Sequence, residues 1–148
     1  MKKFKFTLQK VYEYKQQVLD VLKSEYASLN EEINKVTASI CELEEQYKTT
    51  NAELKEKLSG GMRPNDISVF KAYLARLNAQ IIQLCIRKRF LEGKLEQKRN
   101  EIISVNKEIM TLESLKAKQL EAYRKAELKS QEILIEEFVS SARALKSG

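Results

Sequence analysis

Two long runs of apolar residues, spaced alternately three and four positions apart, lie on either side of a single turn signal. This spacing places a narrow apolar stripe along one face of a helix, and such a stripe is buried only against another helix. The turn signal is segment 59–66, which contains Gly60, Gly61 and the one proline of the chain, Pro64. Because a short loop between helices leads to antiparallel packing, we predict an all-α fold, a long two-helix antiparallel coiled-coil hairpin.

The two expected helices differ in length. The first covers about residues 7–58, the turn residues 59–65 and the second helix about residues 66–142, so that residues 1–148 form a single coiled-coil hairpin. The C-terminal helix is therefore predicted to overhang the N-terminal one by about 25 residues. The overhang carries many apolar residues: Leu120, Tyr123, Leu128, Ile133, Leu134, Ile135, Phe138, Val139 and Leu145. Apolar side chains on a solitary helix favour burial, which predicts a docking or self-association surface; a frayed tail is the alternative.

The turn contains residues that end one helix and begin the next. Glycine adopts left-handed backbone angles without steric cost, so Gly60 and Gly61 are expected to end the first helix. A side-chain oxygen of Asn65 or Asp66 is expected to cap the second helix, with Pro64 just outside it.

Folding the chain about the turn predicts which residues face each other across the seam. Numbers of facing residues should sum to about 124 for a short antiparallel connection. Lys98 occupies a core position of the second run, and this register places Glu25 opposite it, which predicts an ion pair. Lys88 also occupies a core position, and the register gives it no acidic partner. The clean heptads of the second run stop after Leu112, where the first helix runs out of residues.

The first run contains one apparent irregularity. With Val11 and Val18 as core positions, the spacing from Val18 through Leu22 and Tyr26 to Leu29 becomes 4-4-3. Such a stutter locally unwinds a left-handed supercoil. The sequence therefore predicts a straighter region there.

The residue content excludes most catalytic chemistry. The chain has no histidine, no phosphate-binding glycine loop and, as a two-helix fold, no dry pocket that would shift a carboxylate pKa. We therefore predict no enzyme activity, no cofactor and no metal. Cys41 and Cys85 reach similar heights on the two helices but should point apart, which predicts two reduced thiols. No apolar stretch approaches the roughly 20 residues of a membrane span, and no signal core follows the basic start.

The chain carries a net charge of +6, and its basic residues are clustered. One cluster lies at the start, another in residues 87–89 and a third in residues 116–129. A hairpin brings the first and third clusters to the same end, which suits an acidic protein surface or a phosphate backbone. A base-reading motif and an aromatic platform are both missing, so nucleic acid is not an expected partner.

Several segments resemble the FliJ family, the small coiled-coil proteins of the bacterial flagellar export apparatus. The likeness covers nearly the whole chain and is carried by the opening Phe4-Lys5-Phe6-Thr7-Leu8-Gln9-Lys10-Val11, the Gly60-Gly61 turn, the spacing of Phe70, Tyr73, Leu74 and Leu77, the segment Leu112-Glu113-Ser114-Leu115-Lys116, Tyr123 and the ending Ile135-Glu136-Glu137. One departure is visible, since the family ending usually reads Asp-Glu where this chain has Glu136-Glu137.

The resemblance implies a non-enzymatic stalk protein. Such a protein binds the centre of the hexameric flagellar export ATPase, promotes its assembly and activity, and contacts the cytoplasmic domain of the export gate. It also binds export chaperones. The implied location is cytoplasmic, peripheral to the inner face of the cell membrane at the flagellar base.

The resemblance also implies which residues make these contacts. The expected ATPase-binding residues are Phe4, Phe6, Lys10, Tyr123, Lys125, Glu136, Glu137 and Phe138. The expected gate-binding residues, near the turn, are Tyr47, Tyr73, Leu77 and Leu84. Phe4 and Phe6 could instead cap the coiled coil near Lys118 and Leu120. Tyr47, Leu77 and Leu84 also fit inward-facing core positions.

Two other functions fit the same pattern. One is the corresponding stalk of a virulence type III secretion system, which shares architecture and length. The other is a homo-oligomeric coiled-coil scaffold that buries the overhang in a dimer.

Overall fold

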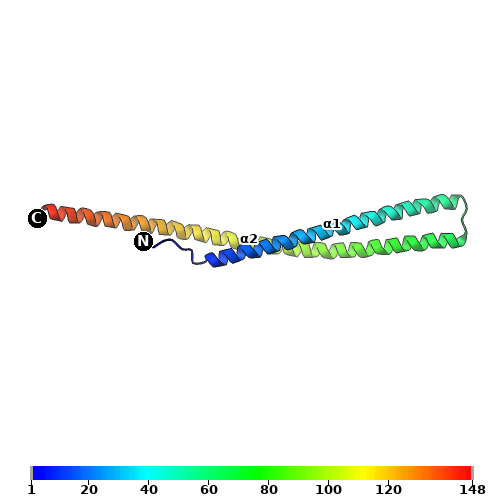
Figure 1. Ribbon diagram of the computed structural model, residues 1–148, viewed down its shortest axis with the longest axis horizontal. Helices are drawn as coiled ribbons and strands as arrows, with labels where there is room; N and C mark the ends of the chain where they lie inside the picture. The colour runs from blue at the N-terminus through cyan, green and yellow to red at the C-terminus, as the bar shows by residue number, and fades with distance from the viewer. Residues whose placement is uncertain (1, 148) are drawn as a thin grey trace. The chain divides into compact units, whose positions relative to one another are not determined.

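The computed structural model describes residues 2–147, apart from the side chain of residue 147. This part of the chain contains two helices, α1, Gln9–Ser59, and α2, Pro64–Ser147, preceded by a short non-helical segment (Figure 1). The helices pack against each other as a helical hairpin without strands, which confirms the predicted fold class. The helix α1 begins two residues later than expected, and α2 extends five residues further.

The turn contains a glycine in the left-handed conformation, as predicted, but the second helix begins at a different residue than predicted. Gly61 has a φ of 87°, in the left-handed region that glycine adopts freely. Its amide donates to the Leu58 carbonyl oxygen at 3.3 Å. Pro64 is the first residue of α2, so the prediction that Asn65 or Asp66 caps this helix was wrong. Proline is favoured at a first helical position because the amide hydrogen it lacks would have no partner there.

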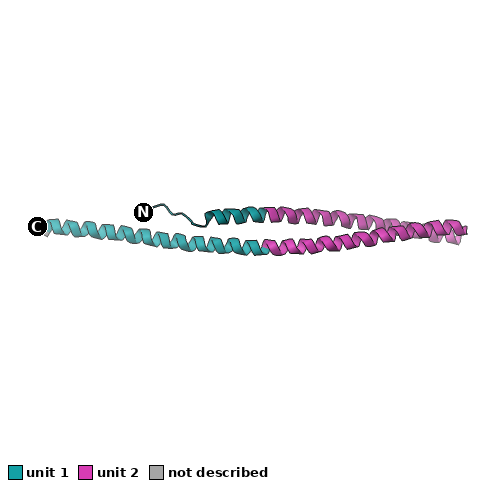
Figure 2. Cartoon of the chain, turned by 90° about the horizontal axis from the view of Figure 1, so that it is seen from below, with its two compact units in different colours: residues 1–20, 103–148 teal, residues 21–102 magenta. Residues whose placement is uncertain are grey.

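The structure divides into two compact units (Figure 2). The second unit, residues 21–102, holds the turn and the seam on either side of it. Its central core cluster consists of Ile33, Val36, Ile40 and Leu91, with Leu29, Ile81, Leu84 and Leu95 packed around it. The buried and half-buried residues of both helices in this unit are thus spaced alternately three and four positions apart.

Ion pairs flank the seam of the second unit. The Lys98 ammonium lies 2.6 Å from a Glu25 carboxylate oxygen, which confirms the predicted pair, and 3.4 Å from Glu101. Arg87 pairs with Glu32 at 2.5 Å. The hydrogen bond to Glu25 raises the pKa of Lys98 above its ordinary value, although burial opposes the shift. These pairs bind α1 to α2 in one register.

The first unit comprises residues 1–20 and 103–148, and its seam corrects the predicted stutter. Leu19 is buried and Tyr12 and Lys15 are half-buried, whereas Val11 is 42% exposed. With these residues as the core positions, the alternating spacing continues without interruption from the start of α1. The predicted stutter was wrong because Val11 and Tyr12 are neighbours and both fit an apolar pattern. Tyr12 is the one that faces α2.

Within the described residues, no helix has a segment long and apolar enough to cross a membrane.

Candidate docking site at the chain termini

The segment before α1 lies along α2 as a strap, defined here as residues 2–8. Residues 2–6 have no regular secondary structure and residues 7–8 form a turn. The apolar residues Phe4, Phe6 and Leu8 of the strap alternate with polar residues. Phe6 is only 7% exposed, and Phe4 and Leu8 are half-buried. Apolar side chains therefore hold the strap in place. Their spacing of two residues differs from the three- and four-residue spacing of the helices.

Tyr123 of α2 anchors the strap through both its ring and its hydroxyl. The Phe4 and Tyr123 rings lie 5.6 Å apart between centroids and are tilted by 52°. The Tyr123 hydroxyl donates to the backbone oxygen of Lys2 at 2.5 Å. Aromatic pairs with this geometry attract each other beyond their burial. Phe4 therefore contacts Tyr123 of α2 in this structure, and Phe6 is buried. Binding of the export ATPase by these two residues stays a prediction.

A shallow hollow opens beside the strap. It has a volume of about 570 Å³ and is lined by Phe4, Lys5, Phe6, Thr7, Gln9, Lys10, Glu13 and Lys116. The Lys116 ammonium donates to the Gln9 side-chain oxygen at 3.3 Å. Three lysines against one glutamate make the hollow basic, and this lining suits an acidic side chain of a partner protein.

Polar side chains in the adjoining seam were not identified from the sequence. The Tyr12 hydroxyl donates to Glu113 at 3.0 Å and accepts from Gln16 at 2.9 Å. Lys15 pairs with Glu108 at 2.6 Å. The hydrogen bond to Glu113, followed by burial, raises the pKa of Tyr12 above its ordinary value. The sequence did contain a signal for these residues. Leu8, Tyr12, Lys15 and Leu19 follow one another at steps of four, three and four, which places Tyr12 and Lys15 at core positions although both carry polar groups.

Beyond Tyr123, α2 continues without a covering segment within the first unit. All side chains of residues 131–141 are exposed, and Phe138 is 74% exposed. We call residues 124–147 the projecting segment; its structure confirms the predicted overhang. Leu128, Ile135, Phe138, Ala142 and Leu145 share one helix face, because they follow steps of seven, three, four and three residues. This face has the spacing of a coiled-coil seam but lacks a partner helix among the described residues.

The expected ATPase-binding residues fall into two groups. Phe4, Phe6 and Lys10 line the hollow, and Tyr123 holds Phe4. The second group lies on the projecting segment: Lys125, Glu136, Glu137 and Phe138 are exposed there, with Lys125 paired to Glu121 at 3.4 Å. At 1.5 Å per residue, Tyr123 and Phe138 lie about 22 Å apart along the helix.

The expected gate-binding residues all lie in the second unit. Tyr73 is exposed, Tyr47 and Leu84 are half-buried, and Leu77 is buried in the seam. Of these four residues, only Tyr73, at 40% exposure, is open to an external partner without a change in the seam. The contact of all four residues with an export gate stays a prediction.

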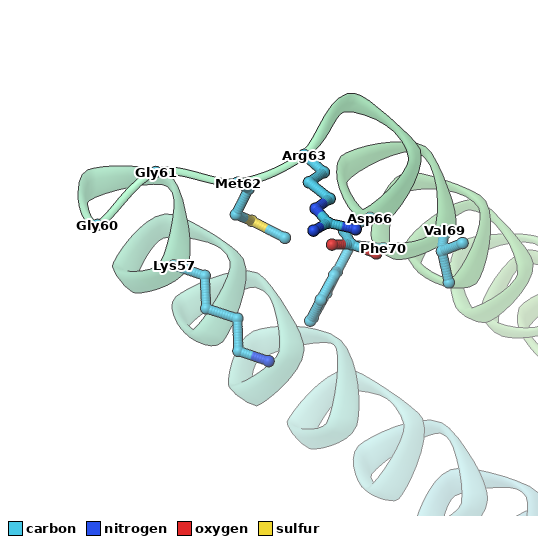
Figure 3. A pocket seen from close by; sticks show the side chains of 8 residues that line it. All are labelled: Lys57, Gly60, Gly61, Met62, Arg63, Asp66, Val69 and Phe70. Carbon is cyan, nitrogen blue, oxygen red and sulfur yellow. The ribbon is translucent and has the colours of Figure 1, made fainter.

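A second hollow, of about 650 Å³, lies at the turn (Figure 3). Met62, Val69 and Phe70 line it together with Lys57 and Arg63, and the Lys57 ammonium lies 5.0 Å from the centroid of the Phe70 ring. Neither hollow contains a paired nucleophile and base. Among the described residues, no group of three or more cysteine, aspartate or glutamate side chains could hold a metal ion. Both cysteines are exposed and free.

These features define the class of the protein: a coiled-coil hairpin of two long helices. The family model described as "Flagellar FliJ protein" matches residues 4–146. The chain therefore belongs to the FliJ family and is a non-catalytic component of flagellar protein export. No curated protein and no solved structure matches the chain.

Proposed function

We propose that this chain is the stalk of the flagellar export ATPase, with the projecting segment and the strap inside the centre of the hexameric ring. The observation that carries this proposal is the uncovered apolar face of α2 beyond Tyr123. Its side chains follow coiled-coil spacing, so a partner that surrounds the helix would bury them. Basic residues of the strap and of the hollow beside it add attraction for an acidic lining.

The stalk also links the ring to the rest of the export apparatus in this proposal. Tyr73, together with Tyr47, Leu77 and Leu84, binds the cytoplasmic domain of the export gate. Export chaperones bind the same protein. The protein then works at the cytoplasmic face of the membrane, at the flagellar base, and motility depends on it.

Stimulation of the purified export ATPase tests the proposal. Phe138→Asp places a charge in the uncovered face, and loss of one buried aromatic contact should weaken binding about 10- to 150-fold. Ile133→Asp is the matched control, because Ile133 is exposed on the opposite side of the same segment. If both variants stimulate the ATPase as well as the unmodified chain, the assignment of the projecting segment is wrong.

A homo-oligomeric scaffold is the second candidate, because a second copy could also cover this face. Sedimentation over a wide range of protein concentrations separates the two functions. A dimer that Phe138→Asp dissociates would favour the scaffold, and a monomer at all concentrations would exclude it.

A further inference from the structure

A second apolar row lies on the outer face of α2 in the second unit, away from α1. Ile82, Ile86 and Phe90 follow one another at four-residue steps, and each is more than half exposed. They lie opposite the seam residues Leu77 and Leu91, since each residue turns the helix by about 100°. The exposure of three large side chains in one row is not explained by the hairpin itself.

Small residues extend this row at both ends. Ala75 and Ala79 precede Ile82 at helical spacing, and Gly93 follows Phe90. A Cβ atom built at Gly93 would meet no atom within 4 Å. Small side chains beside large ones let another helix approach closely and let its side chains fit between. The row from Ala75 to Gly93 thus has the form of one half of a helix–helix interface.

The charges beside this row are mostly basic. Residues 67–91 contain five basic side chains and no acidic one, and Glu92 is the one acidic residue between Ala75 and Gly93. Arg87 is neutralised by Glu32 of α1, whereas Arg76 and Arg89 form no ion pair in the described structure. The Lys94 ammonium lies 4.7 Å from the centroid of the Phe90 ring, so a cation also borders the row at its far end.

We propose that the outer face of α2, from Ala75 to Gly93, docks an acidic amphipathic helix of a partner protein. The apolar row covers the partner's apolar stripe, and Arg76, Arg89 and Lys94 pair with carboxylates that flank this stripe. A second copy of this chain is a poorer occupant, because a symmetric contact would bring the same basic residues against each other. The proposal is independent of the ATPase function, since it uses the opposite face from the seam and a different unit.

A labelled model peptide tests the proposal with the full-length protein. The probe is a helix of about three heptads with Leu at the a and d positions and Glu at the e and g positions, which repels its own copies. Fluorescence anisotropy should show saturable binding that weakens as salt is added. A peptide with Lys in place of Glu should bind at least about tenfold more weakly.

Matched variants locate the binding site. Ile86→Glu should weaken binding of the acidic peptide at least about tenfold, whereas Met110→Glu should leave it unchanged. The two residues are 65% and 66% exposed on the same helix, so each variant adds the same charge at a similar cost. Circular dichroism should show unchanged helicity for both, and stimulation of the ATPase should also be unchanged.

Three results would overturn the proposal. Equal binding by Ile86→Glu and Met110→Glu would place the peptide elsewhere. Loss of binding in Phe138→Glu but not in Ile86→Glu would place it on the projecting segment. A dimer of the unmodified chain that Ile86→Glu dissociates would show that a second copy occupies this face.

Discussion

The central seam and the projecting segment use the same spacing of apolar side chains but bury them differently. Leu91 packs against Ile33, Val36 and Ile40 of α1, whereas Phe138 has no covering segment in the described structure. In the seam this spacing stabilises the fold. On the projecting segment it contributes nothing to the fold of the isolated chain and provides a surface for binding. A heptad pattern thus shows which face of a helix needs a partner, but not whether the partner belongs to the same chain.

The largest expected difference between the two regions is in stability. Leu91→Ala should lower the free energy of unfolding by about 2–4 kcal/mol, because it removes a buried side chain and leaves a cavity. Leu134→Ala should change it by less than about 0.5 kcal/mol, because the side chain is exposed. Urea denaturation followed by circular dichroism measures both. Similar losses in the two variants would contradict the distinction between seam and projecting segment.

We expect an effect of intermediate size at the strap, because its apolar side chains are partly covered but it is only seven residues long. Phe6→Ala should release it from α2 while the helices stay folded, because Phe6, at 7% exposure, is its one buried side chain. Trypsin should then cleave the strap at least about tenfold faster after Lys3 or Lys5, as local opening becomes more frequent. Thr7→Ala is the control, because the Thr7 side chain is exposed. Faster cleavage of both variants would mean that Phe6 does not hold the strap.

The smallest expected effect on stability comes from the ion pair between Glu25 and Lys98 beside the seam. The pKa of Lys98 is raised above its ordinary value of 10.5, so its stabilising contribution is present below that pH and is lost as the pH rises through the folded pKa. Glu25→Gln should therefore lower the urea midpoint slightly at neutral pH, and the difference should vanish at strongly alkaline pH. Glu31→Gln, which breaks an exposed pair with Lys35, should have less effect. A difference that grows with pH would contradict this sign.

Tyr12 follows the same rule at a slightly lower pH. Its pKa is raised above 10.0 by the hydrogen bond to Glu113, so the neutral phenol stabilises the folded chain and ionisation removes this contribution. Tyr12→Phe should reduce the loss of stability seen between about pH 9 and about pH 12. An unchanged alkaline transition in this variant would show that Tyr12 does not take part in it.

Sequence reasoning predicted the hairpin, its register and the overhang, because these depend on patterns that repeat over many residues. The Glu25–Lys98 pair is the clearest case, since one facing rule placed both residues. The same reasoning failed at single positions. Val11 was chosen over Tyr12 as a core residue, and Asn65 or Asp66 over Pro64 at the start of α2. Of the candidate site, the burial of Phe6 was one of two open alternatives, and the polar contacts of Tyr12 and Lys15 were not identified.

The sequence by itself determined that two helices pair antiparallel and that one outlasts the other, because helical periodicity and turn residues are local properties of the chain. Only the tertiary structure decided which of two adjacent residues faces the partner helix. Neighbouring positions differ by about 100° around a helix, so both can satisfy a local pattern. The contact of Tyr12 with Glu113 settles the choice between Val11 and Tyr12, because it joins residues that lie more than a hundred positions apart.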